Sequence, residues 1–280
     1  MQFYHLLQYC VGQVGSGSQV KLEKINMGAI NQNYCLVIDD RKYLVKHFVG
    51  NKWLPIKREI QYDLQTRLAN VGMAVRPLHL SSKQDVYIEQ WIEHSTLSAE
   101  HADDGSEPLT RHAEIDLLAS TLIDVHACTI SAETLSLPMQ WKHYLKYMHD
   151  PERKWRNKSR EYAKLWHDYE QRYQNDFTLC HNDLHISHVG FLNSGKHIIF
   201  DWEYGAFGCR FFDLIACILA NQFEPENANN LIRRYIELSD YHREEVLQRV
   251  RYLQPMVIFT YQLWWQANEY QTQKRNKVTK

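Results

Sequence analysis

The sequence predicts an α+β protein in which residues 1–95 are rich in strands and residues 96–280 are mainly helical. Two observations predict this division. Short runs of β-branched and aromatic residues occur in the first part, whereas apolar residues recur at helical spacing through most of the second. Between them, His101–Pro108 is polar and contains residues that break helices and strands, as is typical of a surface loop at a domain boundary.

The first part is expected to contain four strands and one helix. The turn-like Asp39-Asp40-Arg41 joins two of the strands as an antiparallel hairpin. Pro55 opens the helix, in which apolar residues recur from Ile56 to Leu68, and Gly72 follows its end. The four expected strands are Val20–Ile25, Tyr34–Ile38, Tyr43–Phe48 and Val86–Ile92.

The second part is expected to consist of helices around a small β-element. One helix has an apolar face from Ile115 to Val125, and another begins at Trp141. Polar, basic and aromatic residues alternate along residues 151–176, and we interpret this segment as an exposed helix pair. The β-element is expected from three short apolar runs, Phe177–Cys180, Val189–Leu192 and His197–Phe200.

The composition excludes several classes of function. The formal net charge is -1, so the chain lacks the global positive field expected of a nucleic-acid-binding protein. No run of about 18 apolar residues predicts a membrane span, and the first residues lack the features of a secretory signal. The six cysteines are scattered without a C-x-x-C pair. We therefore expect a cytoplasmic protein with reduced thiols and no nucleic-acid or membrane partner.

Two aspartates, each following a short apolar run, carry most of the information about function. Asp183 lies in Leu179–His188, and Asp201 lies in Ile198–Tyr204. Phosphoryl transfer needs one carboxylate to orient and deprotonate the accepting hydroxyl group, and another to hold the magnesium ion. We therefore expect Asp183 to be the catalytic base and Asp201 to be a metal ligand, with both converging on one cleft.

These two segments also carry a family resemblance. His181-Asn-Asp-Leu-His185 resembles the catalytic loop of the aminoglycoside phosphotransferase and choline kinase superfamily, and Phe200-Asp-Trp-Glu-Tyr204 resembles its metal-binding segment. The chain is most similar to the choline, ethanolamine and thiamine kinases. The resemblance implies a two-lobed, protein-kinase-like fold, with a small antiparallel sheet and one helix before a larger helical lobe. It also implies a small-molecule kinase that uses ATP and Mg²⁺.

The resemblance places a nucleotide site in the first part. Asn26–Asn33 resembles the family's nucleotide loop, in which Gly28 lets the backbone approach the phosphates and Asn31 matches an asparagine of the family. Lys46 lies in a strand among apolar residues, where an unpaired ammonium would be costly. Glu59, on the following helix, matches the glutamate that pairs with the family's lysine.

The end of the strand Val86–Ile92 corresponds to the family's hinge between the lobes. Backbone groups of Gln90 and Ile92 would bond the adenine there.

His188 departs from the family pattern, which has an asparagine at this position. An imidazole nitrogen is a softer donor than an amide oxygen and suits manganese or zinc better than magnesium. We expect His188 to be a second metal ligand, with Mn²⁺ as an alternative to Mg²⁺. Two other readings stay open: a nucleotide-binding pseudokinase, and a zinc-dependent hydrolase that uses His181, His185 and His188 with Asp183 or Asp201.

The expected acceptor pocket is aromatic. A cationic alcohol such as choline, ethanolamine or thiamine would bind aromatic faces beside a carboxylate. Acidic residues of the last third, such as Glu237 and Glu245, leave an aminoglycoside acceptor open as an alternative. The residues expected to bind the acceptor are Trp202, Glu203, Tyr261, Trp264 and Trp265.

Overall fold

The computed structural model describes residues 3–25, 31–48, 53–92, 95–96, 110–148, 151–192 and 196–278. The chain forms two compact units. The first consists of Met1–Asn51, Ile56–Thr96 and Val189–Glu203, and the second of Lys52–Pro55, Leu97–His188 and Tyr204–Lys280. Residues 189–203 thus belong to the first unit, although the sequence was divided at residue 95. The predicted boundary loop, His101–Pro108, lies outside the described residues.

The first unit contains two antiparallel sheets. A five-stranded sheet has the order β1-β2-β3-β5-β4, and a three-stranded sheet has the order β6-β8-β9. Two helices, α1 (Phe3–Val14) and α2 (Arg58–Asn70), belong to the same unit. The strands are β1 (Val20–Ile25), β2 (Gln32–Ile38), β3 (Arg41–His47), β4 (Pro77–Leu80), β5 (Val86–Gln90), β6 (Ser95–Thr96), β8 (Val189–Phe191) and β9 (His197–Ile199).

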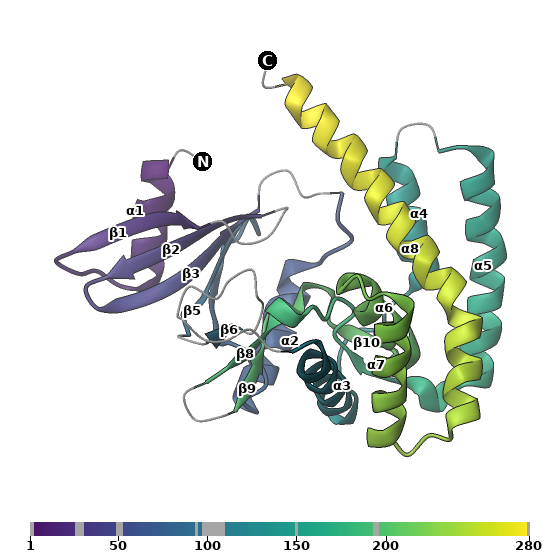
Figure 1. The fold of residues 1–280 in the computed structure, drawn as a ribbon. Helices are drawn as coiled ribbons and strands as arrows, with labels where there is room; N and C mark the ends of the chain where they lie inside the picture. The colour runs from purple at the N-terminus through teal and green to yellow at the C-terminus, as the bar shows by residue number, and fades with distance from the viewer. Residues whose placement is uncertain are drawn as a thin grey trace. The chain divides into compact units, whose positions relative to one another are not determined.

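The two faces of the five-stranded sheet differ in character. Because side chains alternate along a strand, Val45 and Ile88 point to one face and Lys46 and Tyr87 to the other. The first face packs against α1, whose Leu6 joins a buried apolar cluster with Val45 and Ile88. Figure 1 shows α1 lying against the sheet beside β1. The opposite face contacts α2 through polar side chains.

Local sequence signals determine the turns of this unit. The predicted hairpin is confirmed, since Ile38 pairs with Arg41 across the turn between β2 and β3. Asp39 adopts a left-handed φ of 52°, which aspartate tolerates better than most residues. Gly72, with φ of 78°, follows the end of α2 as predicted. Helix α1 and strand β4 were not predicted, because neither sequence shows a strong period or cap.

The second unit is mainly helical, with one two-stranded antiparallel sheet that pairs β7 with β10. Its 3₁₀ turns include η1 (Gln174–Asp176) and η2 (Ile186–His188), and a third, η3 (Trp202–Tyr204), spans the boundary between the units. Its helices and strands are α3 (Arg111–Ala127), α4 (Leu137–Tyr147), α5 (Arg153–Arg172), β7 (Phe177–Cys180), β10 (Ala206–Cys209), α6 (Arg210–Ala220), α7 (Pro225–Leu238) and α8 (Arg243–Val278).

Two predictions for this region need correction. Residues 153–172 form the single helix α5 rather than a helix pair, because no glycine or proline interrupts them. The predicted β-element is two separate sheets: β7 pairs with β10, whereas β8 and β9 pair with each other in the first unit. Short apolar runs show where strands form but not which strand each one joins.

Helices α4, α5 and α8 pack together in the second unit, where α3 and α6 contribute further buried residues. Helix α4 contacts both α5 and α8, and these three run alongside one another in Figure 1. Buried aromatic side chains fill the space between them, and the indole N–H of Trp141 donates to the hydroxyl of Thr260 at 2.7 Å. None of the helices in the described ranges is both long and apolar enough to cross a membrane. All six cysteines are free thiols, as expected.

Candidate functional site

Lys46 lies at the centre of a group of carboxylates in the first unit. Its Nζ atom is 3.1 Å from Oδ1 of Asp201 and 3.5 Å from Oε1 of Glu89. Burial alone would lower the pKa of Lys46, but the charges of Asp201, Glu89 and Glu203 outweigh it, so the pKa lies above its ordinary value. Lys46 is therefore a buried ammonium whose charge is fixed by its neighbours.

The predicted pair between Lys46 and Glu59 is wrong. Glu59 is exposed in the first turn of α2 and accepts a hydrogen bond from Gln84 at 2.8 Å. Its place beside the lysine is taken by Glu89, on the neighbouring strand β5. A helix that follows a lysine-bearing strand is not sufficient to identify the partner, because the pairing depends on the rotation of the helix about its axis.

Asp201 lies two residues after the end of β9 and has a left-handed φ of 57°. Residues held in this region of backbone space cost about 1–3 kcal/mol each and cluster at functional sites. Two contacts anchor the turn after Asp201: the indole N–H of Trp202 donates to the carbonyl of Ile199 at 3.0 Å, and Glu203 pairs with Arg58 at 2.8 Å. The turn thus holds the Asp201 carboxylate beside Lys46.

These contacts correct two of the acceptor predictions. Trp202 is fully buried, and a buried ring presents no face to a ligand. The carboxylate of Glu203 is committed to Arg58, whose guanidinium also lies 3.7 Å over the ring of Phe48. Burial, followed by the charge of Asp201, raises the pKa of Glu203 above its ordinary value, and Arg58 opposes that rise. Trp202 and Glu203 therefore shape the turn that carries Asp201 rather than an acceptor pocket.

The remaining nucleotide-site predictions rest on the backbone. Gly28 lies outside the described residues, and Asn31 immediately precedes β2. The backbone N–H of Gln90 donates to the carbonyl of Arg76 at 3.0 Å, so this N–H is not available for the predicted adenine contact. Asn31 and Ile92 stay predictions.

In the second unit, Asp213 braces the loop that carries Asp183. Its carboxylate accepts the backbone N–H groups of His181 at 2.8 Å and Asn182 at 2.7 Å. Asn182 adopts a left-handed φ of 64°, and its side-chain amide donates to the carbonyl of Tyr204 at 2.9 Å. The carboxylate of Asp213 is fully buried at the start of α6, so the loop is braced from that helix.

Asn221 braces the other end of the same loop and was missed by the sequence analysis. Its Oδ1 accepts the N–H of Ile186 at 2.9 Å, and its Nδ2 donates to the carbonyl of Leu184 at 3.0 Å. Asn221 directly follows α6, where an asparagine is ordinarily interpreted as a helix cap. The loop that carries Asp183 is therefore fixed on both sides of this residue.

His188 is oriented by Asp183. Its Nδ1 lies 2.9 Å from the backbone carbonyl of Asp183, and because a carbonyl only accepts, Nδ1 carries the proton. In the neutral ring Nε2 then holds the lone pair, which is the arrangement that a metal ligand needs. This geometry is compatible with the predicted metal role of His188.

The zinc-hydrolase reading finds no support in the positions of the histidines. In the described part of the chain, His181, His185 and His188 do not bring three ligand atoms within metal-binding distance of one another, with or without Asp183 or Asp201. Over the described residues, one group has ligand atoms with metal-binding spacing: His126, Cys180 and Asp213. Both nitrogens of His126 and both oxygens of Asp213 already make hydrogen bonds, so we interpret that group as structural.

An aromatic cluster lies near Asp183 in the second unit. The ring of Trp264 contacts those of Trp53 and Trp265, with centroids 5.9 and 5.4 Å apart, and its N–H donates to the hydroxyl of Tyr204. Tyr261 donates to a carbonyl of α6. Burial first, and the charge of Asp183 next, raises the pKa of Tyr261 well above its ordinary value, which places this phenol within electrostatic reach of Asp183.

The acidic residues that left an aminoglycoside acceptor open have other partners. Glu237 pairs with Arg234 at 3.0 Å on α7, and Glu245 accepts a backbone N–H at the start of α8. Both side chains are exposed. These carboxylates therefore belong to the solvated surfaces of their helices, and they do not specifically indicate an aminoglycoside acceptor.

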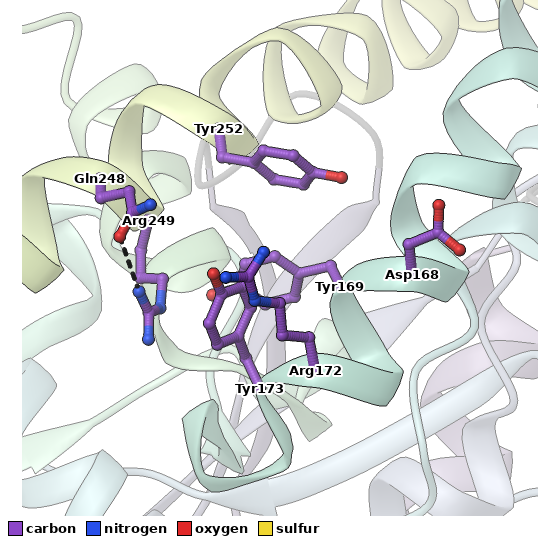
Figure 2. Close-up of a pocket in the computed structure, with 7 residues that line it drawn as sticks. All are labelled: Asp168, Tyr169, Arg172, Tyr173, Gln248, Arg249 and Tyr252. Carbon is purple, nitrogen blue, oxygen red and sulfur yellow. Dashed lines mark hydrogen bonds between the residues drawn. The ribbon is translucent and has the colours of Figure 1, made fainter.

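A separate cavity of about 140 Å³ lies between α5 and α8 (Figure 2). It is smaller than the roughly 300–1,000 Å³ of ordinary ligand pockets. Its neighbour Asp176 accepts hydrogen bonds from Tyr169 at 2.6 Å and Arg249 at 3.1 Å, so the side chains around it tie the two helices together. We interpret this cavity as a gap in the packing between two helices and not as a ligand site. Its lining is Asp168, Tyr169, Arg172, Tyr173, Gln248, Arg249 and Tyr252.

Comparison with solved structures identifies the fold. Choline kinase LicA from Streptococcus pneumoniae aligns with a TM-score of 0.70 and 17% identity, covering 100% of this chain and 98% of that one. LicA in complex with AMP aligns with 19% identity and a TM-score of 0.70, over 95% of this chain and 90% of that one. An ethanolamine kinase from Plasmodium vivax aligns with a TM-score of 0.67 and 16% identity, over 96% and 81% of the two chains. The predicted fold class is confirmed.

Sequence comparison gives a short and a long match. The short one is to choline kinase B1 of Caenorhabditis elegans, 44% identical over 43 residues, which are 15% of this chain and only 12% of that protein. The long one is to the model of a protein family. It spans residues 21–247, from β1 into α8, and so includes Lys46, Asp183 and Asp201. This second match covers most of the chain and confirms the predicted class, a small-molecule kinase. The chain belongs to the phosphotransferase enzyme family.

Proposed function

We propose that this protein transfers the γ-phosphate of ATP to the hydroxyl group of a small cationic alcohol, such as choline, ethanolamine or thiamine. The observation that carries the proposal is the contact between Lys46 and Asp201, two residues 155 positions apart in the sequence. A lysine that binds phosphates and a carboxylate that binds the metal are the two charged groups that a kinase brings together around its nucleotide. Family membership and the AMP complex of LicA support the use of a nucleotide.

The donor chemistry at Asp201 suits magnesium. Mg²⁺ is commonly held by one or two carboxylates together with the phosphates of its nucleotide, and it keeps several waters. Asp201 offers a hard oxygen donor, and its side chain is 28% exposed. When bound, the ion neutralises charge on the phosphate oxygens. Asp201 is the residue of the first unit proposed to hold it, and the metal role of His188 stays a prediction.

Each side chain of the proposal has one task. Lys46 contacts the phosphates, and Asp183 orients the acceptor hydroxyl and removes its proton. Asp213 and Asn221 fix the loop that presents Asp183. Glu203 and Arg58 fix the turn that presents Asp201.

The acceptor is proposed to bind at the aromatic cluster of Tyr261, Trp264 and Trp265. A quaternary or primary ammonium is attracted to the faces of tryptophan and tyrosine rings. The electrostatic contact between Tyr261 and Asp183 supports a position for the acceptor close to the base. The choline and ethanolamine kinases among the similar structures support the same class of acceptor.

The test is a phosphotransfer assay of the purified chain. ATP with Mg²⁺ or Mn²⁺ is offered together with choline, ethanolamine, thiamine or an aminoglycoside, and ADP release and phosphorylated product are measured. We expect product from at least one cationic alcohol. The variant Asp183→Ala should lose on the order of 10²- to 10⁴-fold in kcat while retaining affinity for ATP.

The control is Asp240→Ala, at an exposed aspartate outside the site, which should match the wild type. Near-normal turnover by Asp183→Ala would remove this residue from the role of base. ATP binding by the wild type with no turnover of any acceptor would instead select the pseudokinase reading.

A further inference from the structure

Lys46 has two carboxylate partners, which come from different parts of the first unit. Glu89 lies on β5, next to the lysine's own strand, and Asp201 follows β9. In the sheet, Lys46 is opposite Tyr87, so Glu89, two residues further along β5, points to the same face on the diagonal. The position of Glu89 relative to Lys46 is therefore set by the register of the sheet.

The two carboxylates differ in how firmly they are held. The side chain of Asp201 is 28% exposed, whereas that of Glu89 is 3% exposed. Oε2 of Glu89 accepts a hydrogen bond from Gln65 of α2 at 2.8 Å. The side chain of Asp201 is thus the one that can rotate toward a metal ion, whereas the side chain of Glu89 keeps its position beside Lys46.

Gln65 is itself locked in place. Its Nε2 also donates to the carbonyl of Val75 at 2.9 Å, and its Oε1 accepts the hydroxyl proton of Tyr87 at 2.8 Å. Gln65 is 2% exposed and Tyr87 is fully buried. Both polar atoms of the amide are therefore hydrogen-bonded: two bonds fix Gln65, and the third holds Glu89. Helix α2 thus contributes through its glutamine and not through Glu59.

We propose that Glu89, held by Gln65, is the positioning residue of Lys46: it keeps the ammonium aimed at the nucleotide phosphates when Asp201 turns to the metal ion. This inference rests on the proposed function. Without Glu89, Lys46 would have Asp201 as its remaining close partner, and the lysine would compete with the metal ion for that carboxylate. The loss of Glu89 should therefore weaken the binding of ATP with magnesium.

The experiment measures the Kd of ATP with Mg²⁺ by calorimetry for four proteins: the wild type, Glu89→Gln, Lys46→Met and the double variant. Glu89→Gln should bind about 10- to 100-fold more weakly, the cost of losing a charged hydrogen-bonding partner. Binding stoichiometry should stay unchanged, because a merely structural defect lowers the fraction of competent protein rather than its affinity. In the Lys46→Met background, Glu89→Gln should add less than about twofold.

Gln65→Met provides a second variant that leaves both charges in place. It removes the hydrogen bond to Glu89 with little change in volume, and we expect ATP to bind about 3- to 10-fold more weakly. Glu23→Gln is the matched control, since Glu23 is an exposed carboxylate on β1 of the same sheet, and it should bind ATP like the wild type.

The outcomes separate this inference from the proposed function. If the wild type binds ATP but Glu89→Gln and Gln65→Met bind it equally well, the positioning role is overturned and the proposed function stands. An undiminished effect of Glu89→Gln in the Lys46→Met background would also overturn it, since Glu89 would then not act through the lysine. A wild type that binds no ATP would overturn both.

Discussion

Nε2 of His126 lies 3.1 Å from Oδ2 of Asp213, the oxygen that also accepts the backbone N–H of His181. His126 lies in the last turn of α3, and its Nδ1 lies 2.9 Å from the hydroxyl of Tyr235 on α7. Because the carboxylate only accepts, Nε2 carries the proton and Nδ1 accepts from the tyrosine. One imidazole thus connects two helices to the loop that presents Asp183.

The first prediction concerns Asp213. Asp213→Asn should lower the free energy of unfolding by about 3 kcal/mol, because an amide replaces one buried acceptor oxygen with a donor and leaves a backbone N–H of the loop without its partner. Denaturant unfolding measures this loss, and kcat should fall with it. Asp240→Asn, at an exposed site, is the control. Equal stability of the two variants would contradict the bracing role.

The second prediction concerns stability in acid. Burial lowers the pKa of His126 below its ordinary 6.5, against the opposing effect of Asp213, so the folded protein holds this ring neutral. Below about pH 6.5 the unfolded chain binds a proton that the folded chain resists, so stability is present above that pH and is lost as pH falls.

His126→Gln, which keeps a donor but does not titrate, should make the decline of the unfolding free energy between pH 7 and 5 shallower, by up to about 1.4 kcal/mol per pH unit. His112→Gln, at an exposed histidine, should leave the slope as it is. A slope unchanged in His126→Gln would show that other groups govern acid stability.

The third prediction concerns stability in alkali. Burial raises the pKa of the Cys209 thiol from 9.0 to about 12. Between these values the unfolded chain loses a proton that the folded chain keeps, so stability is full below pH 9 and falls as pH rises toward 12. Cys209→Ser should reduce this fall by about 1.4 kcal/mol per pH unit, measured by urea unfolding from pH 8 to 10.5. Cys128→Ser, at a partly exposed site, is the control.

The fourth prediction concerns the ion pair between Arg58 and Glu203, which fixes the turn that carries Asp201. Arg58→Met should cost about 3–5 kcal/mol of stability, because it leaves the buried carboxylate of Glu203 without its partner and next to Asp201. The double variant Arg58→Met/Glu203→Gln should recover much of that loss. Thermal and denaturant unfolding of the single and double variants measure the coupling, and purely additive losses would mean that the two side chains act independently.

The fifth prediction concerns acceptor binding. Trp264→Leu should raise the KM for the cationic alcohol about 3- to 30-fold, since a partly buried ring attracts a cation more strongly than an exposed one. Trp265 is 61% exposed, so Trp265→Leu should raise it by less than about fivefold. Trp155→Leu, at a ring stacked on Phe259 elsewhere in the unit, is the control and should leave KM unchanged. If both indole variants keep the wild-type KM, the acceptor binds elsewhere.

The sequence predicted the strands of the five-stranded sheet better than it predicted their partners. β1, β2, β3 and β5 were expected within a few residues, because alternation and turn residues are local signals. The partner of Lys46 was predicted wrongly, because two candidates were available and the choice depends on how α2 is rotated over the sheet. The period of the sequence does not show which of Glu59 and Glu89 lies beside Lys46.

The braces around the candidate site were harder to predict than the site itself. Asp183 and Asp201 belong to short segments whose residue types are tied to chemistry. Arg58 and Asn221 act through contacts with residues 145 and 35–37 positions away, and nothing in their local sequence distinguishes them from an ordinary surface arginine or helix cap. Only the folded chain brings them to the turn and the loop that they hold.

The assignment of Val189–Glu203 to the first unit has a consequence for synthesis and truncation. A chain ending near residue 96 would contain Lys46 and Glu89 but would lack Asp201, β8 and β9. The smaller unit therefore becomes complete only after most of the larger one has been translated, and its last contacts close a loop of more than 90 residues, which favours slow, late assembly. Dividing this gene at the apparent domain boundary would therefore separate Lys46 from Asp201 and leave the first unit incomplete in either fragment.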